Sequence, residues 1–124
     1  MSLVPDGLKY TKDHEWAKLE GGTATIGVTD HAQRELGDIV FVELPKVGLK
    51  VEAGQSFGTI EAVKTVAELY SPVSGTIAEV NSALSGDAGV INQDPYGNGW
   101  IIKVKTDKPA LDGLMDSTAY KGII

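Results

Sequence analysis

Lys64 is the residue whose type and surroundings most clearly favour chemistry. It lies between two segments of strand-like composition, residues 57–63 and 65–70, so a hairpin is expected to present it at a tip. No other Lys or Arg occurs from residue 51 to residue 85, whereas a lysine that only confers solubility more often shares its surface with others. A flexible four-carbon stem ending in an amine would be accessible there to a modifying enzyme. The spacing alone gives nearly equal weight to an exposed turn lysine without a role.

The other reactive side chains favour an enzyme poorly. The chain has no cysteine, so it has neither a thiol nucleophile nor a sulfur-ligated zinc, and redox chemistry would need a borrowed cofactor. His14 and His31 are the only histidines, and two partly buried, hydrogen-bonded rings are a better interpretation than a metal site. Glu61 with Glu68 could act as acid and base, but their spacing fits a solvated acidic face better. An acidic enzyme using paired carboxylates stays open as an alternative.

Short strands separated by glycines are expected to position these residues. The 15 glycines are spread along the chain, which is typical of an all-β domain with many tight turns. Residues 14–20 and 23–29 flank Gly21-Gly22 and predict a hairpin. The continuous apolar run at residues 39–42 predicts a strand buried on both faces or at a sheet crossing. Further strands are expected at residues 57–63, 65–70, 76–80 and 100–105.

Two short helical regions are expected to flank the strands. The first spans about residues 30–36, with Asp30 as its cap, Gln33 reaching back to Asp30, and Gly37 ending it. The second lies near the C-terminus and comprises a helical face over residues 110–115, then a turn capped by Asp116 or Ser117 that ends at Gly122.

An internal repeat favours a symmetric architecture. Gly58-Thr59-Ile60-Glu61 recurs 17 residues later as Gly75-Thr76-Ile77-Ala78-Glu79. Two similar strand entries on either side of one hairpin predict a pseudo-symmetric sandwich, in which each half contributes strands to both sheets. Trp16, Phe41 and Trp100 are interpreted as core anchors of this sandwich, because large aromatic side chains bury area efficiently.

Length and composition exclude several classes of protein. The 124 residues predict a single domain over residues 1–124, in which residues 1–3 could be a cloning remnant. Lys and Arg number 11 against 17 Asp and Glu, and a net charge of −6 argues against nucleic acid or an anionic membrane as a partner. No apolar run is long enough to span a membrane and no signal peptide is evident, so a cytoplasmic protein is expected. The mitochondrial matrix is the alternative if a presequence was removed.

The segment around Lys64 resembles a known attachment site. The run Glu61-Ala62-Val63-Lys64-Thr65-Val66-Ala67-Glu68-Leu69-Tyr70-Ser71-Pro72-Val73-Ser74-Gly75 is similar to the lipoyl attachment segment of the glycine cleavage system H-protein family. Lys64 matches the lysine that this family lipoylates. Residues 65–68 depart from the small residues and Asp that are commoner there. Further segments similar to the family, in family order, are Gly7-Leu8-Lys9-Tyr10, His14-Glu15-Trp16, Ala24-Thr25-Ile26-Gly27, Thr29-Asp30-His31-Ala32-Gln33, Val40-Phe41-Val42-Glu43-Leu44-Pro45, Pro95-Tyr96-Gly97 and Gly99-Trp100.

The resemblance implies a carrier protein rather than an enzyme. The implied fold is mostly β, a barrel-sandwich hybrid of two antiparallel sheets like those of lipoyl and biotinyl carriers. Lipoic acid would be attached to Lys64 as an amide and would carry the aminomethyl group of glycine. The implied partners of this expected monomer are glycine decarboxylase (P protein), aminomethyltransferase (T protein), dihydrolipoamide dehydrogenase (L protein), and a lipoate ligase or lipoyltransferase.

Carboxylates are the expected holders of the loaded arm. An aminomethyl-bearing arm ends in an amine that should be protonated, so nearby carboxylates could hold it away from water. Glu15 and Glu68 are the first candidates for this cradle, and Glu61 is a third.

Related carriers are the principal alternatives. A biotinyl domain usually has methionines beside its lysine, whereas Val63 and Thr65 flank Lys64. Lipoyl domains of 2-oxoacid dehydrogenases normally have Asp before the lysine, which this chain lacks. A lipoate-relay or regulatory protein of the H-protein type stays open.

Overall fold

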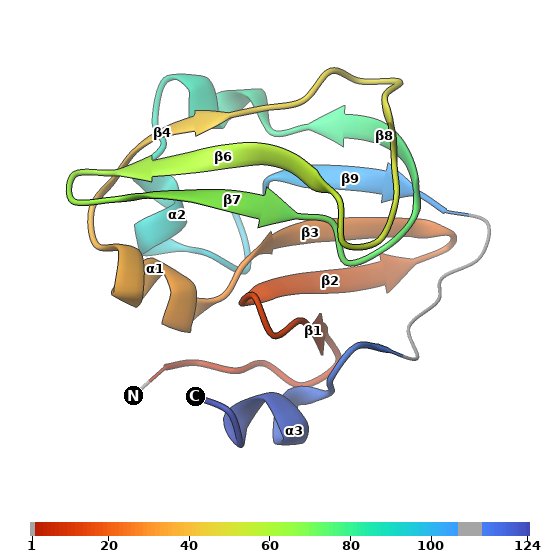
Figure 1. Cartoon of the computed structure of the whole chain (residues 1–124), viewed down its shortest axis with the longest axis horizontal. Helices are drawn as coiled ribbons and strands as arrows, with labels where there is room; N and C mark the ends of the chain where they lie inside the picture. The colour runs from red at the N-terminus through yellow and green to blue at the C-terminus, as the bar shows by residue number, and fades with distance from the viewer. Residues whose placement is uncertain (1, 107–112) are drawn as a thin grey trace.

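The strands form two antiparallel sheets that face each other (Figure 1). The structure is a computed structural model that describes residues 2–106 and 113–124. One sheet has the strand order β1-β2-β3-β9-β8-β5, and the other has the order β4-β6-β7. The strands are β1 (Lys9–Tyr10), β2 (Glu15–Glu20), β3 (Thr23–Val28), β4 (Ile39–Glu43), β5 (Lys50–Val51), β6 (Ser56–Ala62), β7 (Val66–Tyr70), β8 (Gly75–Val80) and β9 (Ile102–Lys105).

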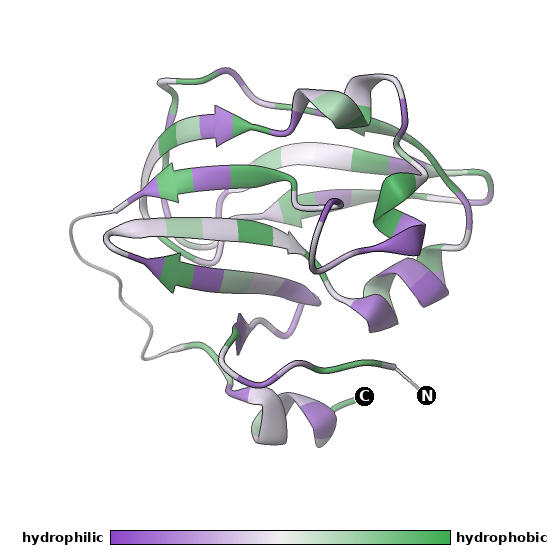
Figure 2. Cartoon of the chain, turned by 180° about the vertical axis from the view of Figure 1, so that it is seen from behind, coloured by the Kyte–Doolittle hydropathy of each residue, from purple (hydrophilic) through white to green (hydrophobic). Residues whose placement is uncertain are grey.

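The strand predictions are confirmed within a few residues, including the hairpin across Gly21-Gly22. Hydrophobic and hydrophilic residues alternate along the strands (Figure 2), so each sheet turns one face toward the other. The main core lies between these faces and is built of aliphatic side chains such as Ile26, Ile60 and Ile102, which are at most 1% exposed.

The internal repeat has a physical basis in strand packing. Its first copy lies in β6 of the three-stranded sheet and its second in β8 of the six-stranded sheet, so both sheets receive one copy. A Cβ on Gly58 would lie 2.3 Å from the carbonyl oxygen of Glu43, and a Cβ on Gly75 would lie 2.2 Å from that of Lys105. Each copy therefore needs glycine because a neighbouring backbone approaches too closely for any side chain.

Helix α1 (Asp30–Leu36) has the predicted length but a different cap. The side-chain oxygen of Thr29, at the end of an extended segment, accepts a hydrogen bond from the Ala32 amide at 3.1 Å. Asp30 lies inside the first turn, where its carboxylate accepts from the Gln33 side chain at 2.7 Å. Gly37 ends the helix at φ +77°, as predicted, because this backbone conformation favours glycine.

The remaining helices are short: η1 (Ser82–Ser85), α2 (Val90–Gln93) and α3 (Ser117–Lys121). Helix α3 begins at an Asp116 cap and ends at Gly122, as predicted. The prediction of a helical face over residues 110–115 is wrong for Met115, which forms an antiparallel bridge with Tyr10 because each backbone satisfies the other's amide at 2.8 Å. Residues 110–112 of that prediction lie outside the described residues.

The aromatic predictions divide between the core and the surface. Trp16 is 1% exposed and packs with Tyr10 and Tyr120 in a second core cluster, which Trp100 contacts from a partly buried position. The prediction for Phe41 is wrong, because its side chain is 47% exposed. The run at residues 39–42 is likewise not buried on both faces. Strand β4 is an edge strand whose outer face is uncovered, and a register shift lies between Ile39 and Phe41.

Candidate functional site

Lys64 lies at the tip of the β6–β7 hairpin, as predicted (Figure 1). The turn closes through a hydrogen bond from the Ala62 amide to the Thr65 carbonyl at 2.8 Å. The Val63 amide donates to the Asp38 carbonyl at 3.0 Å, which ties the tip to the segment after α1. Lys64 is exposed, and among the described residues no carboxylate forms an ion pair with its amine. The hairpin therefore presents a primary amine on a braced turn.

The lysine stem passes close to Gly37, at the end of α1. A Cβ placed on Gly37 would lie 3.5 Å from the Cε of Lys64, an ordinary van der Waals distance, so the lysine stem lies against the end of the helix. The Asn92 side chain fixes this turn. Its amide nitrogen donates to the Gly37 carbonyl at 2.8 Å, and its amide oxygen accepts from the Ile39 backbone amide at 2.9 Å. The Asn92 side chain thus bridges the backbone on both sides of the turn beside the lysine.

A cavity of about 160 Å³ opens between α1, β7 and the start of β2. Its lining combines aliphatic side chains with one histidine and four acidic residues. The lining residues are Asp13, His14, Glu15, Val28, Ala32, Glu35, Leu36, Ile60, Ala67, Glu68 and Leu69. The structure therefore brings Glu15 and Glu68 together at one cavity, which lies on the α1 and β7 side of the hairpin that carries Lys64.

Glu68 and Glu61 differ in their access to this cavity because of their strands. Strand β7 is at the edge of the three-stranded sheet, so the Glu68 side chain can reach the rim, where the Tyr70 hydroxyl donates to it at 3.1 Å. Strand β6 is the middle strand, and Glu61 is not among the lining residues. Glu61 is therefore the one predicted carboxylate that does not line the cavity.

Glu15 is an unusual carboxylate because it is only 2% exposed. Its oxygens accept hydrogen bonds from the Thr11 hydroxyl at 2.7 Å and from the Tyr70 amide at 3.1 Å. Burial raises the pKa of Glu15 to about 7, because desolvation disfavours the ionised form more than these two bonds favour it. Glu15 can therefore change its charge near neutral pH.

His14 is a rim residue that the sequence did not single out for this cavity. It has a left-handed backbone conformation, with φ +68°, and its Nδ1 shares a 2.8 Å hydrogen bond with the Tyr120 hydroxyl. Burial, together with the neighbouring His31 ring at 4.7 Å, lowers the pKa of His14. A polar residue at positive φ was the available signal, since such residues are uncommon outside functional or tightly held turns.

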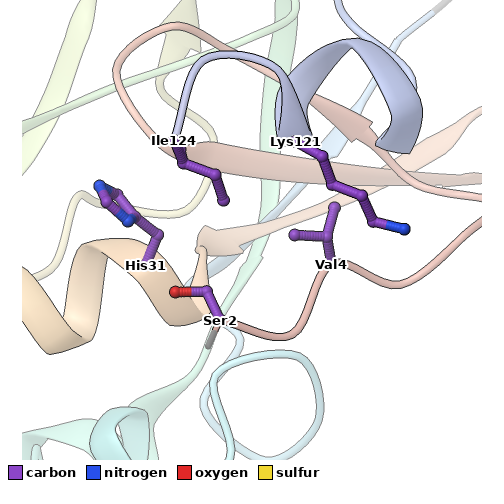
Figure 3. Close-up of a pocket in the computed structure, with 5 residues that line it drawn as sticks. All are labelled: Ser2, Val4, His31, Lys121 and Ile124. Atoms are coloured by element: carbon purple, nitrogen blue, oxygen red, sulfur yellow. The ribbon is translucent and has the colours of Figure 1, made fainter.

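A second hollow, of about 490 Å³, lies between the two ends of the chain and α1 (Figure 3). Its lining residues are Ser2, Val4, His31, Lys121 and Ile124. His31 and Lys121 lie at opposite ends of this hollow in Figure 3, so it holds no close pair of reactive groups. The cavity beside the hairpin is the better candidate site.

A metal site and a membrane span find no support in residues 2–106 and 113–124. No group of three or more His, Asp or Glu side chains in these ranges could hold a metal ion. None of the helices in these ranges has the length and apolar character needed to cross a membrane.

The sequence matches one protein family and several of its members. Residues 8–124 match the family model described as glycine cleavage H-protein. The chain is 57% identical over 124 residues to the glycine cleavage system H protein of Chlorobium limicola, covering 98% of this chain and 97% of that protein. The identity to the Rubrobacter xylanophilus protein of the same name is 56% over 112 residues, covering 90% and 89%.

The same likeness holds in three dimensions. A crystal structure of a glycine cleavage system H protein from Mycobacterium marinum matches with a TM-score of 0.89 and 42% sequence identity, covering 96% of this chain and 97% of that chain. The match spans both sheets and agrees with the predicted barrel-sandwich hybrid.

Proposed function

The chain belongs to the glycine cleavage H-protein family, whose members are lipoyl carriers rather than enzymes, and from this premise we propose that Lys64 is its attachment residue. The observation that carries the proposal is the exposed amine at a braced hairpin tip, which forms no ion pair within the described part of the chain. Lys64 also matches the lipoylated lysine of the family segment. A lipoyl group, when bound, supplies a redox-active disulfide, which this cysteine-free chain lacks.

In this role the chain serves three enzymes in turn. It receives the aminomethyl group of glycine from glycine decarboxylase, delivers it to the aminomethyltransferase, and is reoxidised by dihydrolipoamide dehydrogenase. Tethering keeps the transferred group at high effective concentration at whichever enzyme the chain contacts. The net charge of −6 favours brief encounters with basic surfaces, because complementary charge raises association rates without tight binding. The bacterial origin of the relatives supports a cytoplasmic location.

The cavity beside the hairpin would shelter a protonated amine. Aliphatic side chains make up most of its walls, and the acidic residues Glu15 and Glu68 are among the residues that line it. A cation in the cavity favours the ionised form of Glu15, whose pKa of about 7 leaves it only partly ionised at neutral pH without one. Glu15 and Glu68 are therefore the proposed cradle, and Glu61 is left out of it.

Mass analysis tests the attachment residue. Protein produced with a lipoate–protein ligase and lipoic acid is expected to gain one lipoyl increment, mapped to Lys64 by blocked tryptic cleavage. Lys64→Arg is expected to remove the increment, whereas the matched variant Lys46→Arg, also at an exposed lysine, is expected to keep it. An increment that persists in Lys64→Arg would contradict the proposal.

Stimulation of glycine decarboxylation tests the pathway. The lipoylated chain is expected to support the exchange of glycine carboxyl carbon with bicarbonate by glycine decarboxylase. A chain that is lipoylated at Lys64 but supports no exchange would indicate a lipoate-relay or regulatory protein of the same type.

A further inference from the structure

Four apolar side chains lie uncovered around the base of Lys64. Val40 is 57% exposed, Phe41 47%, Val63 76% and Val66 60%. Single exposed apolar residues are ordinary on protein surfaces. Here four of them lie within two adjoining segments, β4 and the β6–β7 tip, which the Val63 to Asp38 backbone hydrogen bond holds together. We call these four residues the hairpin patch.

The strand register places two residues of the patch, Phe41 and Val66, on one face of the three-stranded sheet. Phe41 pairs with Glu61 across β4 and β6, and Glu61 pairs with Val66 across β6 and β7. Residues paired in this way lie side by side on the same face of a sheet. Phe41 and Val66 therefore flank Glu61 in a single row. The three strands lie at the front of the molecule in Figure 1, with the tip at the left.

The charged residues of the three strands that carry the patch are all acidic. Strands β4, β6 and β7 contain the carboxylates of Glu43, Glu61 and Glu68 and contain neither Lys nor Arg. Glu43 pairs with Thr59, and Thr59 pairs with Glu68, so two of these carboxylates form the next row of the same face. A partner that fits this surface has an apolar centre and a basic rim.

We propose that the hairpin patch is the docking surface for the enzyme that acylates Lys64, and this inference rests on the proposed function. The reason is the short length of the unmodified Lys64 side chain. The unmodified amine stands only four methylenes from the backbone, so the acylating active site must come within that length of the tip and must contact Val63 and Val66. Enzymes that use the finished arm meet its far end and need not touch the patch.

The covalent step constrains this partner further. The Lys64 amine attacks the carbonyl carbon of a lipoyl adenylate that the ligase makes from lipoic acid and ATP. The new bond is the amide, the broken bond joins the carbonyl carbon to the phosphate oxygen, AMP leaves, and the ammonium group gives up two protons overall. The adenylate and its phosphate are anionic, so a basic active-site rim suits both this donor and the carboxylates around the patch.

Paired valine substitutions test the docking surface. The rate of lipoyl increment on the unmodified chain is measured by intact mass with limiting lipoate–protein ligase, ATP and lipoic acid. Val66→Thr and Val63→Thr/Val66→Thr remove apolar surface while keeping side-chain shape and strand propensity. Val47→Thr is the matched control, because Val47 is 61% exposed and lies in the β4–β5 loop, away from the tip.

The double variant is expected to slow acylation at least about fivefold, the effect of losing one energetically important contact. Val47→Thr is expected to match the parent. Each variant, loaded to completion by long incubation, is then expected to be reduced by dihydrolipoamide dehydrogenase and NADH at the parental rate.

Three results would overturn the inference, and each has a separate meaning. Equal acylation rates for parent and double variant would reject the docking surface while leaving Lys64 as the attachment residue. Equal losses in the acylation and reduction assays would show a general docking face rather than one for the acylating enzyme. Absence of any increment on the parent chain would reject the proposed function as well.

Discussion

Glu15 and His14 are neighbours in the chain and respond to pH in opposite directions. Glu15 has a raised pKa, so the folded chain holds a proton that the unfolded chain has already released. His14 has a lowered pKa, so its ring binds a proton more readily in the unfolded chain than in the folded chain. Stability therefore falls with rising pH because of Glu15, and falls with decreasing pH below about 6.5 because of His14.

Glu15→Gln is expected to remove the first of these effects. The window for Glu15 runs from its ordinary pKa of 4.5 to its folded pKa of about 7. Across it the parent is expected to lose about 3–4 kcal/mol of unfolding free energy from this group, since one pKa unit corresponds to about 1.4 kcal/mol. The side-chain amide introduced by the substitution can still accept from the Tyr70 backbone amide and can donate to the Thr11 hydroxyl.

Urea unfolding of parent and variant at pH 5 and pH 8 measures this difference. The variant is expected to gain stability over the parent as pH rises, because subtraction cancels the contribution of His14, which both proteins share. Glu68→Gln, at an exposed rim position, is the control and is expected to follow the parent. Parallel pH profiles for Glu15→Gln and the parent would contradict the assigned pKa.

The same substitution tests the proposed cradle. If Glu15 holds a protonated amine, Glu15→Gln is expected to shorten the lifetime of the loaded chain in solution by roughly tenfold, as for the loss of one charged hydrogen bond. The measurement is release of formaldehyde and ammonia from the isolated loaded chain over time. An unchanged lifetime would reject the role of Glu15 while leaving Lys64 as the attachment residue.

Residue-level chemistry was predictable from the sequence where it depended on local position. The tip position of Lys64 was predictable because a lysine between two strand-like segments lies at a turn, whereas only the family resemblance indicated its chemistry. The burial of Glu15 was not, because alternation along a strand assigns a carboxylate to solvent and gives no sign of the Thr11 and Tyr70 donors. Glu15 and Glu68 were named as candidates on their charge, but their common cavity was not predictable, because its lining comes from segments that pack together only in the fold.

At the scale of elements, the sequence periodicity predicted where strands and helices begin and end, but it did not predict which of their residues are buried. The Asp30 cap was misassigned by one residue because Thr29 and Asp30 are both good caps, and only the extended backbone of Thr29 decides between them. The burial of residues 39–42 was misassigned because an apolar run cannot show that β4 is an edge strand. The repeat, in contrast, predicted that both sheets would receive similar strands. Its two glycines, Gly58 and Gly75, lie in different sheets, and each faces a neighbouring backbone carbonyl too close for a side chain.

Gly58→Ala tests that steric demand. The added Cβ would lie 2.3 Å from the Glu43 carbonyl oxygen, so β4 and β6 must move apart, which is expected to cost about 2–3 kcal/mol or more. Gly86→Ala is the control, because nothing lies within 4 Å of its added Cβ and its φ is −111°. Thermal or denaturant unfolding of both variants measures the difference, and equal stabilities would show that β4 yields without strain.

At the scale of the whole molecule, the two ends of the chain close one side of the sandwich. They lie side by side in both views (Figures 1 and 2), and Tyr10 stacks on Tyr120 with ring centroids 4.7 Å apart. The Ser117 hydroxyl donates to the Asp6 carboxylate, and the Leu3 amide donates to the Asp30 carboxylate at 2.9 Å. Terminal segments usually fray, but these hold the second core cluster together beside His14 at the cavity rim.

Tyr120→Phe is expected to loosen this closure without opening the sheets. The hydroxyl is buried and joins Thr29 at 2.7 Å and His14 at 2.8 Å, so its removal leaves the buried Thr29 hydroxyl and the half-buried His14 ring short of one partner each and is expected to cost about 1–3 kcal/mol. Tyr70→Phe is the control, because its hydroxyl bonds to the exposed Glu68 and its loss is expected to leave stability near that of the parent.

Hydrogen exchange locates the effect of Tyr120→Phe within the molecule. The amides of Tyr10 and Met115, which bond to each other's carbonyls across the terminal bridge, are expected to exchange faster in the variant. Amides between β3 and β9 are expected to keep parental rates, because the lost hydroxyl bonds to Thr29 and His14, which lie outside both strands. Uniform acceleration over both groups would show instead that the chain ends and the sandwich unfold as one cooperative unit.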